Sequence, residues 1–212
     1  MKTLLSWSGG KDCTLALYYL KNNPKIELVG LVCTISQFDR VGLHGTRNGL
    51  ISKQAESLNL PVHFIITSAD NYESDLLKGL QSLRNNNIKF ENIAFGDIHL
   101  AELKSYREKI LHRLNISAIF PLWQITTHEI SKQIIELNIK ALLVCINNKL
   151  LGKNFLGKEY SNIINELHNV DICGENGEFH TFVYSAPFFT YKIEVSAGQM
   201  IENTFNTYID IL

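Results

Sequence analysis

The chain has 212 residues, which is enough for one compact domain or for one domain with a smaller addition. Hydrophobic residues make up 45% and charged residues 19%, a balance typical of a soluble globular protein. Lysine and arginine number 20 against 21 aspartate and glutamate residues, so the formal net charge is −1. This balance argues against a protein that holds nucleic acid mainly through phosphate contacts.

The cysteine pattern and the hydropathy narrow the class further. The four cysteines are widely spaced and include no Cys-x-x-Cys pair, which argues against a structural zinc site. No apolar run approaches the roughly 18 residues that a membrane span requires. The N-terminus predicts a strand and a glycine-rich turn instead of a signal peptide. We therefore expect a cytoplasmic protein with no membrane contact.

The first predicted elements are a strand over residues 3–7 and a helix over residues 12–21, joined by a turn that contains Gly9 and Gly10. Ser8 and the two glycines leave room for close backbone approach, and the helix start offers free N–H groups to an anion. Lys11 adds a positive charge and Asp12 a carboxylate that could hold a metal ion. This combination predicts a phosphate site, and an ordinary Gly-Gly turn is the alternative. The spacing differs from the phosphate loop of kinases and from the dinucleotide fingerprint.

Strand and helix patterns alternate from the N-terminus to about Ile146. The further predicted strands cover residues 28–34, 62–67, 92–95, 118–120 and 141–146. The further predicted helices cover residues 46–58, 72–85, 101–114 and 127–137. This alternation predicts an α/β fold with a doubly wound, mostly parallel sheet, which binds ligands at the carboxyl ends of its strands.

Candidate site residues follow two of these strands. Gly96 and Asp97 end the strand over residues 92–95, so Asp97 either reaches the ligand or caps the helix that begins near Ala101. His44 lies in the loop after the second strand and either approaches a nucleotide or is exposed to solvent. Arg107 either faces a phosphate or lies on a solvated helix face.

The chain changes character after Ile146, where Asn, Lys and Gly become frequent. We expect a short helix over residues 159–167 and a strand pair over residues 182–196. A soft boundary near residues 121–126 divides the chain into residues 1–122, which bind the nucleotide, and residues 123–212. The second part is expected to be a smaller α+β subdomain that folds back over the nucleotide cleft and binds the substrate.

A polar stretch in this second part is a further candidate site. Residues 173–181 contain Glu175, Asn176, Glu178, His180 and two glycines. Such a density of polar groups is poor core material and is frequent in site loops. A solvated turn before a hairpin is the alternative.

Four motifs, taken in order, resemble the diphthine–ammonia ligase family of the PP-loop ATP pyrophosphatases. They are Ser-Gly-Gly-Lys-Asp at residues 8–12, Phe-Gly-Asp-Ile at 95–98, Phe-Pro-Leu-Trp at 120–123 and Gly-Glu-Asn-Gly-Glu-Phe-His-Thr at 174–181. Gln54-Ala-x-x-Leu-x-Leu-Pro61 and Phe-Leu-Gly-Lys at 155–158 lie between them. The resemblance covers residues 2 to about 189. It implies a PP-loop fold of the adenine nucleotide alpha hydrolase-like, Rossmann-like type.

The resemblance implies that a substrate carboxylate attacks the α-phosphate of ATP and that ammonia then displaces AMP to leave an amide. The nucleotide site would comprise Ser8, Gly9, Gly10, Lys11, Asp12, Cys13, His44, Gly96 and Asp97. Lys11 would stabilise the departing pyrophosphate. Asp12 or Asp97 would hold Mg²⁺ directly or through water.

The resemblance assigns the acceptor chemistry to residues 175–181. Glu175 or Glu178 would take a proton from ammonium, because the nucleophile must be neutral ammonia. Asn176 and His180 would orient the carboxylate or the oxyanion. Cys13 stands where the family usually has serine, and its place near a helix N-terminus beside Lys11 predicts a lowered thiol pKa.

The expected partners are ATP, ammonium, a carboxylate acceptor and, in a homodimer, a second copy of the chain. The acceptor is diphthine on a translation elongation factor if the source makes diphthamide, and is otherwise unknown. Two other functions remain open. One is a tRNA-modifying or thiolating PP-loop enzyme, which the charge balance and the cysteine pattern disfavour. The other is a nucleotide sensor without catalysis.

Overall fold

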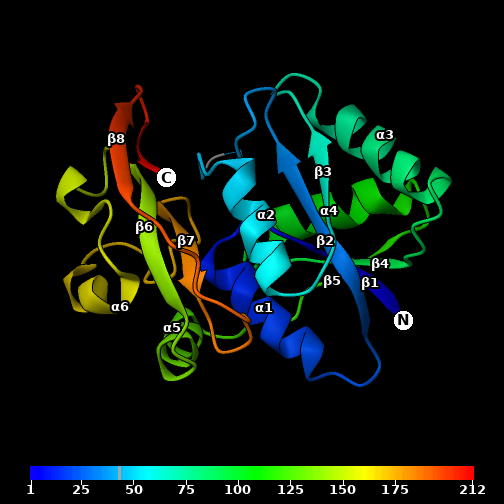
Figure 1. Cartoon of the computed structure of the whole chain (residues 1–212), viewed down its shortest axis with the longest axis horizontal. Helices are drawn as coiled ribbons and strands as arrows, with labels where there is room; N and C mark the ends of the chain where they lie inside the picture. The colour runs from blue at the N-terminus through cyan, green and yellow to red at the C-terminus, as the bar shows by residue number, and fades with distance from the viewer. Residues whose placement is uncertain (43) are drawn as a thin grey trace.

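A computed structural model describes residues 1–42 and 44–212. Its first part is a five-stranded parallel sheet in the order β3-β2-β1-β4-β5 (Figure 1). The strands are β1 (Lys2–Ser6), β2 (Glu27–Ile35), β3 (Val62–Ile66), β4 (Asn92–Ala94) and β5 (Ser117–Ile119). The strand order reverses between β1 and β4, and ligands of doubly wound sheets bind at such a switch point. The predicted α/β class is confirmed.

Helices cover both faces of this sheet. They are α1 (Lys11–Lys21), α2 (Asn48–Ser57), α3 (Tyr72–Asn85) and α4 (Ala101–His112). Leu5 of β1 packs in one buried cluster with residues of α1 and α2, whereas its neighbour Leu4 packs in another with residues of α3 and α4. Successive side chains of a strand point to opposite faces, so apolar neighbours on β1 indicate a sheet buried on both sides.

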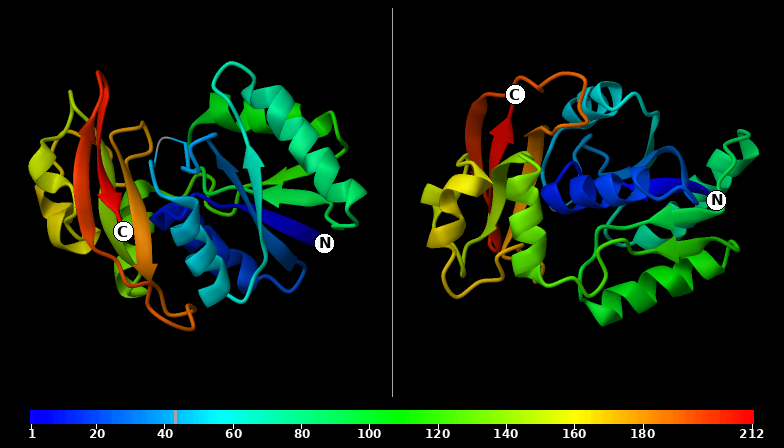
Figure 2. Two further views of the ribbon diagram at one scale, coloured as in Figure 1. Left: turned by 45° about the horizontal axis from the view of Figure 1, so that its top comes forward. Right: turned by 90° about the horizontal axis from the view of Figure 1, so that it is seen from below.

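The second part is a four-stranded antiparallel sheet in the order β7-β6-β9-β8. Its strands are β6 (Lys140–Asn147), β7 (Phe179–Ser185), β8 (Ala197–Glu202) and β9 (Asn206–Ile211). Its helical segments are α5 (Thr127–Glu136), η1 (Lys153–Phe155), α6 (Tyr160–Ile163) and η2 (Ile164–Glu166). Figure 2 shows α5 beside α1, and one buried cluster contains Leu17 of α1, Ile130 of α5 and Phe182 of β7. The two parts therefore share a core.

Two predictions about this second part are wrong. The strand predicted over residues 141–146 does not continue the parallel sheet, because it pairs antiparallel with β7 and β9. The strand pair predicted over residues 182–196 lies later, at β8 and β9, and only β7 occupies the start of that stretch. Aromatic and β-branched residues indicate strand character but do not identify the partner strand.

The division predicted between residues 122 and 123 falls between β5 and α5, and it stays a prediction. Within residues 1–42 and 44–212, no helix is both long enough and apolar enough to cross a membrane.

Candidate functional site

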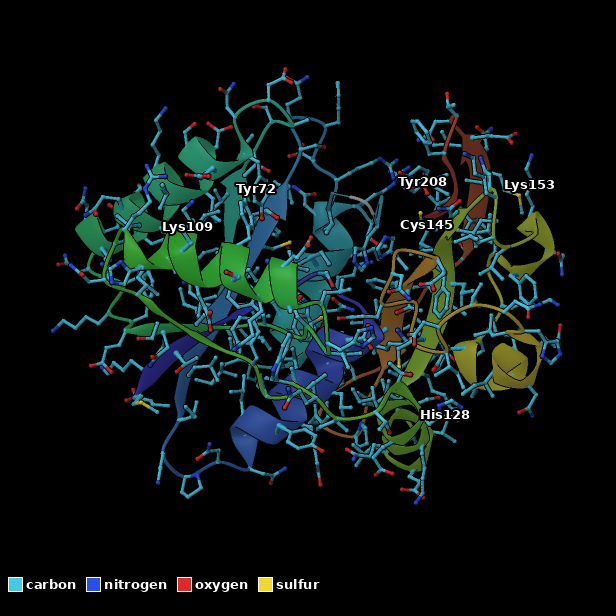
Figure 3. All side chains as sticks on the ribbon, turned by 180° about the vertical axis from the view of Figure 1, so that it is seen from behind. Tyr72, Lys109, His128, Cys145, Lys153 and Tyr208 are labelled. Atoms are coloured by element: carbon cyan, nitrogen blue, oxygen red, sulfur yellow. The ribbon has the colours of Figure 1, made fainter. Side chains whose placement is uncertain are left out.

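A cavity of about 790 Å³ lies at the carboxyl ends of the parallel strands, where the second part of the chain meets the first. Its wall includes residues that follow β1, β2, β3 and β4, among them Ser8, Ser36, Ser68 and Asp97. Residues 173–177 and 179–181 close it from the other side. Figure 3 shows Tyr72, the first residue of α3 and part of this wall, on the side of the first sheet. The volume is in the range of small-molecule sites.

The turn at residues 8–12, here called the glycine loop, depends on Gly9. The φ angle of Gly9 is +80°, and a Cβ there would lie 2.7 Å from Ile51 Cδ1 and 2.8 Å from Gln54 Oε1. Ser8, Lys11, Asp12 and Cys13 line the cavity. Among the residues that the structure describes, the cavity wall does not include Gly9 or Gly10. Both are buried, and they act on the site through the shape of the turn.

Residues 173–181, here called the C-terminal loop, lead into β7, which bonds directly to the glycine loop. The Lys11 N–H donates to Thr181 Oγ1 at 3.1 Å, and the Val183 N–H donates to the Gly9 carbonyl at 2.8 Å. β7 is an edge strand of its sheet, so it has backbone groups free for these bonds. The second part of the chain is therefore bonded to the candidate phosphate site itself.

Lys11 is buried, with 2% of its side chain exposed. Its ammonium donates to Asp12 Oδ2 at 2.9 Å and to the Cys173 carbonyl, and it faces the rings of Phe179 and Tyr160 at 5.1 and 5.4 Å. Burial lowers the pKa of the Lys11 ammonium, but Asp12, Cys173 and Tyr160 together more than offset this, so the net pKa is raised. Lys11 stays charged at any physiological pH.

Asp12 fits a metal ligand better than Asp97 does. Asp12 Oδ1 is buried without a hydrogen-bond partner in the described part of the chain, and burial raises the pKa of this carboxyl. Asp97 accepts from Arg107 Nε at 2.5 Å and from Arg107 Nη2 at 3.1 Å, so both its oxygens are engaged. Among residues 1–42 and 44–212, no group of three or more His, Cys, Asp or Glu side chains could hold a metal. Asp12 would thus be the first candidate ligand for Mg²⁺, and nucleotide phosphates or water would supply most of the other ligands.

Asp97 and Arg107 each had an alternative interpretation from the sequence, as a helix cap and as part of a solvated helix face. The residue before the first turn of α4 is Leu100, so Asp97 is not the cap of this helix. Arg107 lines the cavity and stacks over the Phe95 ring at 4.3 Å, so it does not lie on a solvated face. A Cβ on Gly96 would lie 2.9 Å from the Cys13 nitrogen, which explains the glycine before Asp97.

His44 and His180 come from different parts of the chain and pack against each other in the cavity wall, with ring centroids 4.5 Å apart and ring planes tilted by 34°. His44 Nδ1 lies 3.3 Å from the Thr181 carbonyl oxygen. Burial lowers the pKa of His44 to about 4 and that of His180 well below its usual value, so both rings are neutral at pH 7. The structure therefore brings His44, predicted from its loop, to the C-terminal loop.

An ion cluster fixes the loop that carries His44. Arg40 Nη1 donates to the Gly45 carbonyl at 2.7 Å and to Asp210 Oδ1 at 2.8 Å. Arg47 Nε donates to Asp210 Oδ1 at 3.1 Å, and its Nη2 donates to Asp210 Oδ2. Asp210 belongs to β9, as does Tyr208, which packs on Gly45 and lies next to Cys145 in Figure 3. These contacts hold the loop against the second sheet.

The two glutamates of the C-terminal loop differ in orientation. Glu175 lines the cavity, and its Oε1 accepts from the N–H groups of Ile98 and His99 at 2.8 and 3.2 Å. Burial raises the pKa of Glu175. Glu178 is 4% exposed and is not among the described residues of the wall.

Glu178 instead holds its own loop together. Its carboxylate accepts from the backbone N–H groups of Asp171 and Asn176, both at 2.9 Å, and from Asn176 Nδ2 at 3.1 Å. This leaves Asn176 in the wall and Glu178 behind it. The geometry favours Glu175 over Glu178 as a group that meets a ligand.

The Cys13 thiol is buried and donates to the Gly10 carbonyl at 3.1 Å, with Ser8 Oγ at 3.6 Å. Burial raises its pKa, so the prediction of a lowered pKa is wrong. The loss of water outweighs the hydrogen bonds from Ser8 and Gly9 that favour a thiolate, and the nearby Asp12 carboxylate adds to the rise.

Two further site residues were given no role from the sequence. Thr181 accepts the first N–H of α1 through its hydroxyl. Gln54 is fully buried in α2 and bonds to both the glycine loop and β7. The only signal for Gln54 was its place at the start of the motif over residues 54–61.

Comparisons with known proteins agree with these motifs. The family model for the diphthamide synthase N-terminal domain matches residues 1–118, and the model for the C-terminal domain matches residues 126–212. The mouse protein named diphthine–ammonia ligase is 25% identical over 154 residues, which are 69% of this chain and 58% of the mouse protein. The human protein of that name is 26% identical over 161 residues, or 72% of this chain and 60% of its own length.

A third relative, diphthine–ammonia ligase of Saccharomyces cerevisiae, is 24% identical over 232 residues, which are 90% of this chain and 34% of the yeast protein. The chain thus spans less than two thirds of the length of these curated relatives.

Proposed function

Because this chain belongs to the diphthamide synthase family, we propose that it is an ATP-dependent ligase that forms an amide from a carboxylate and ammonia. A carboxylate oxygen attacks the α-phosphorus of ATP, and the bond from that phosphorus to the bridging oxygen breaks to release pyrophosphate. Ammonia then attacks the carbonyl carbon of the acyl-adenylate. AMP leaves with the electron pair of the broken C–O bond, and the amide nitrogen loses one proton.

One observation carries this proposal: the glycine loop and the C-terminal loop line the same cavity and are hydrogen-bonded to each other. A ligase of this kind must hold a polyphosphate and an acceptor side by side. A protein that only binds a nucleotide does not need the polar groups of residues 173–181 in the same wall.

The glycine loop is proposed to hold the pyrophosphate. Ser8 Oγ and the start of α1 offer donors to phosphate oxygens, and Lys11 places a permanent positive charge in the wall. Mg²⁺, when bound, would supply further positive charge to the polyphosphate, and Asp12 Oδ1 is the free oxygen that fits this role. His44 and Gly96 complete the nucleotide side of the wall.

The C-terminal loop is proposed to handle the acceptor and ammonia. Glu175 is the proposed base, because it lines the cavity and its raised pKa makes it a better proton acceptor than an ordinary carboxylate. Asn176 can donate to the acceptor or to the oxyanion through its side-chain amide. His180, held neutral, can donate or accept at the same wall.

Diphthine on a translation elongation factor is the proposed acceptor, and the name of the mouse and human relatives, diphthine–ammonia ligase, supports diphthine. Residues 1–122 would bind ATP and residues 123–212 the acceptor. The cytoplasm is the proposed location, since ATP and the translation machinery are available there. A homodimer is a separate proposal, which sedimentation of the purified protein would test.

The test is to incubate the protein with ATP, Mg²⁺ and ammonium chloride, with and without an elongation factor that carries diphthine. The proposal predicts AMP and pyrophosphate, formed only with the acceptor. ADP and phosphate as products would contradict it. Tight ATP binding without turnover on this or any other carboxylate would favour a nucleotide sensor.

A further inference from the structure

We infer that Gln54 is a positioning residue that fixes the glycine loop against β7 and thereby shapes the pyrophosphate site. Gln54 lies in α2, and the wall of the cavity contains no residue of α2 among those described. It can therefore influence a ligand only through the groups that it contacts. The inference rests on the proposed function of the glycine loop.

The side chain of Gln54 uses all its polar groups on three residues of two distant segments. Its Nε2 donates to the Gly9 carbonyl at 3.1 Å and to the Val183 carbonyl at 2.6 Å. Its Oε1 accepts from Trp7 Nε1 at 2.8 Å. One amide thus joins the residue after β1, the glycine loop and β7.

The same helix also supports the loop by shape. The Cβ that Gly9 lacks would collide with Ile51 Cδ1 and with Gln54 Oε1, so α2 lies directly against the turn. The Gly9 carbonyl accepts from Gln54 and from the Val183 N–H. This carbonyl is consequently held by α2 on one side and by β7 on the other.

No other side chain of similar size offers this set of bonds. Methionine fills a similar volume but leaves the Val183 carbonyl and the Trp7 N–H buried without this partner. Glutamate keeps the shape but faces two carbonyl oxygens with at most one donor proton in place of two. Either change should loosen the glycine loop against β7, where the bonds from Val183 to Gly9 and from Lys11 to Thr181 remain, and it leaves every side chain of the cavity wall chemically unchanged, although Trp7 loses its partner.

The experiment compares Gln54→Met with Gln133→Met. Gln133 of α5 accepts from the Tyr19 hydroxyl of α1 at 2.8 Å, so it also joins the two parts of the chain, but away from the glycine loop. Binding of inorganic pyrophosphate and of ATP with Mg²⁺ is measured by calorimetry, and unfolding is followed by circular dichroism. KM and kcat for AMP formation are measured in parallel.

We expect Gln54→Met to weaken pyrophosphate binding about tenfold or more and to raise the KM for ATP, whereas Gln133→Met changes either by about twofold at most. Equal pyrophosphate affinity in Gln54→Met and wild type would overturn the inference, whatever the loss of stability.

Gln54→Glu provides a second variant that keeps the side-chain shape. Its affinity deficit relative to wild type should grow as pH rises, because the deprotonated carboxylate has no proton to donate, and a deficit independent of pH would count against the inference.

The outcomes separate this inference from the proposed function. Wild-type protein that binds neither pyrophosphate nor ATP would overturn both. Wild-type protein that makes AMP normally, together with unaffected Gln54 variants, would overturn only the role of Gln54.

Discussion

The ammonium of Lys11 donates a hydrogen bond to the main-chain carbonyl of Cys173, which lies 162 residues further along the chain. The lysine of the glycine loop is therefore anchored in the second part of the protein, where its ammonium lies over the rings of Tyr160 and Phe179. A lysine that served only as a phosphate ligand would need none of these contacts. The arrangement links the candidate phosphate site to the C-terminal loop.

Lys11→Met should destabilise the protein as well as abolish turnover. The variant removes the partner of the Asp12 carboxylate, whose side chain is 28% exposed, and an unpaired charge that is partly buried costs about 1–3 kcal/mol. Urea denaturation measures this loss. The double variant Lys11→Met/Asp12→Asn should recover part of it because it removes the orphaned charge, and equal stability of wild type and Lys11→Met would contradict the account.

Glu175→Gln and Glu178→Gln should fail in different ways. Glu175→Gln keeps the fold but removes the proposed base, so the rate of amide formation should fall on the order of a hundredfold at pH 7. This rate should recover as pH rises, since free ammonia then replaces the lost base. Glu178→Gln places an amide against three N–H groups and should cost about 1–3 kcal/mol of stability. Full activity in Glu175→Gln at pH 7 would remove it as the base.

The adjacent His44 and His180 rings predict a pH dependence of stability. The pKa of His44 is lowered to about 4 in the folded state, and that of His180 also lies well below its usual value. Between about pH 4 and pH 6.5 the unfolded chain binds protons at these rings and the folded chain does not, so this contribution to stability falls as pH falls.

His44→Gln isolates the contribution of His44. The pKa values of Asp12 and Glu175 are raised in the folded state, so their contribution to stability grows as pH falls, but it does so in both proteins. Between pH 7 and pH 5, the free energy of unfolding should decrease more in wild type than in His44→Gln, by on the order of 1 kcal/mol. Urea denaturation at the two pH values gives the comparison, and parallel curves would contradict the burial of a neutral His44.

Asp210→Asn should loosen the loop that carries His44. Arg40 and Arg47 both bind Asp210, and their donors hold the pKa of this carboxyl far below its usual range. We expect the KM for ATP to rise about fivefold with little change in kcat, because the loop is misplaced and the reacting groups are intact. Glu202→Gln is the control, since its partner Lys153 lies on the exposed surface. An equal effect of the two variants would assign Asp210 no role in the site.

Much of the first part of the fold follows from local patterns. The helix predicted over residues 72–85 has these bounds, and the strand–turn–helix unit at the N-terminus lies within one residue of the prediction. Buried parallel strands read as continuous apolar runs and therefore stand out in the sequence. The glycine loop was recognisable because its glycines, charge and helix start lie next to each other.

The remainder depends on contacts between distant segments. Neither the pairing of β6 with β9 nor the bond from Gln54 to Val183 leaves a periodic signal. The rise in the Cys13 pKa has the same origin, because burial of the thiol is decided by the packed fold and not by its neighbours in sequence. The orientation of Glu178 into its own loop could likewise be seen only in three dimensions.

The central claim is that the protein transfers the AMP group of ATP to a carboxylate bound in this cavity. The most direct measurement is the incorporation of labelled pyrophosphate into ATP, in the presence of Mg²⁺ and a diphthine-bearing elongation factor but without ammonium. Reversible adenylation predicts label in ATP only when the acceptor is present, and loss of this signal in Lys11→Met. Absence of label with acceptor, together with accumulation of ADP and phosphate, would contradict the account.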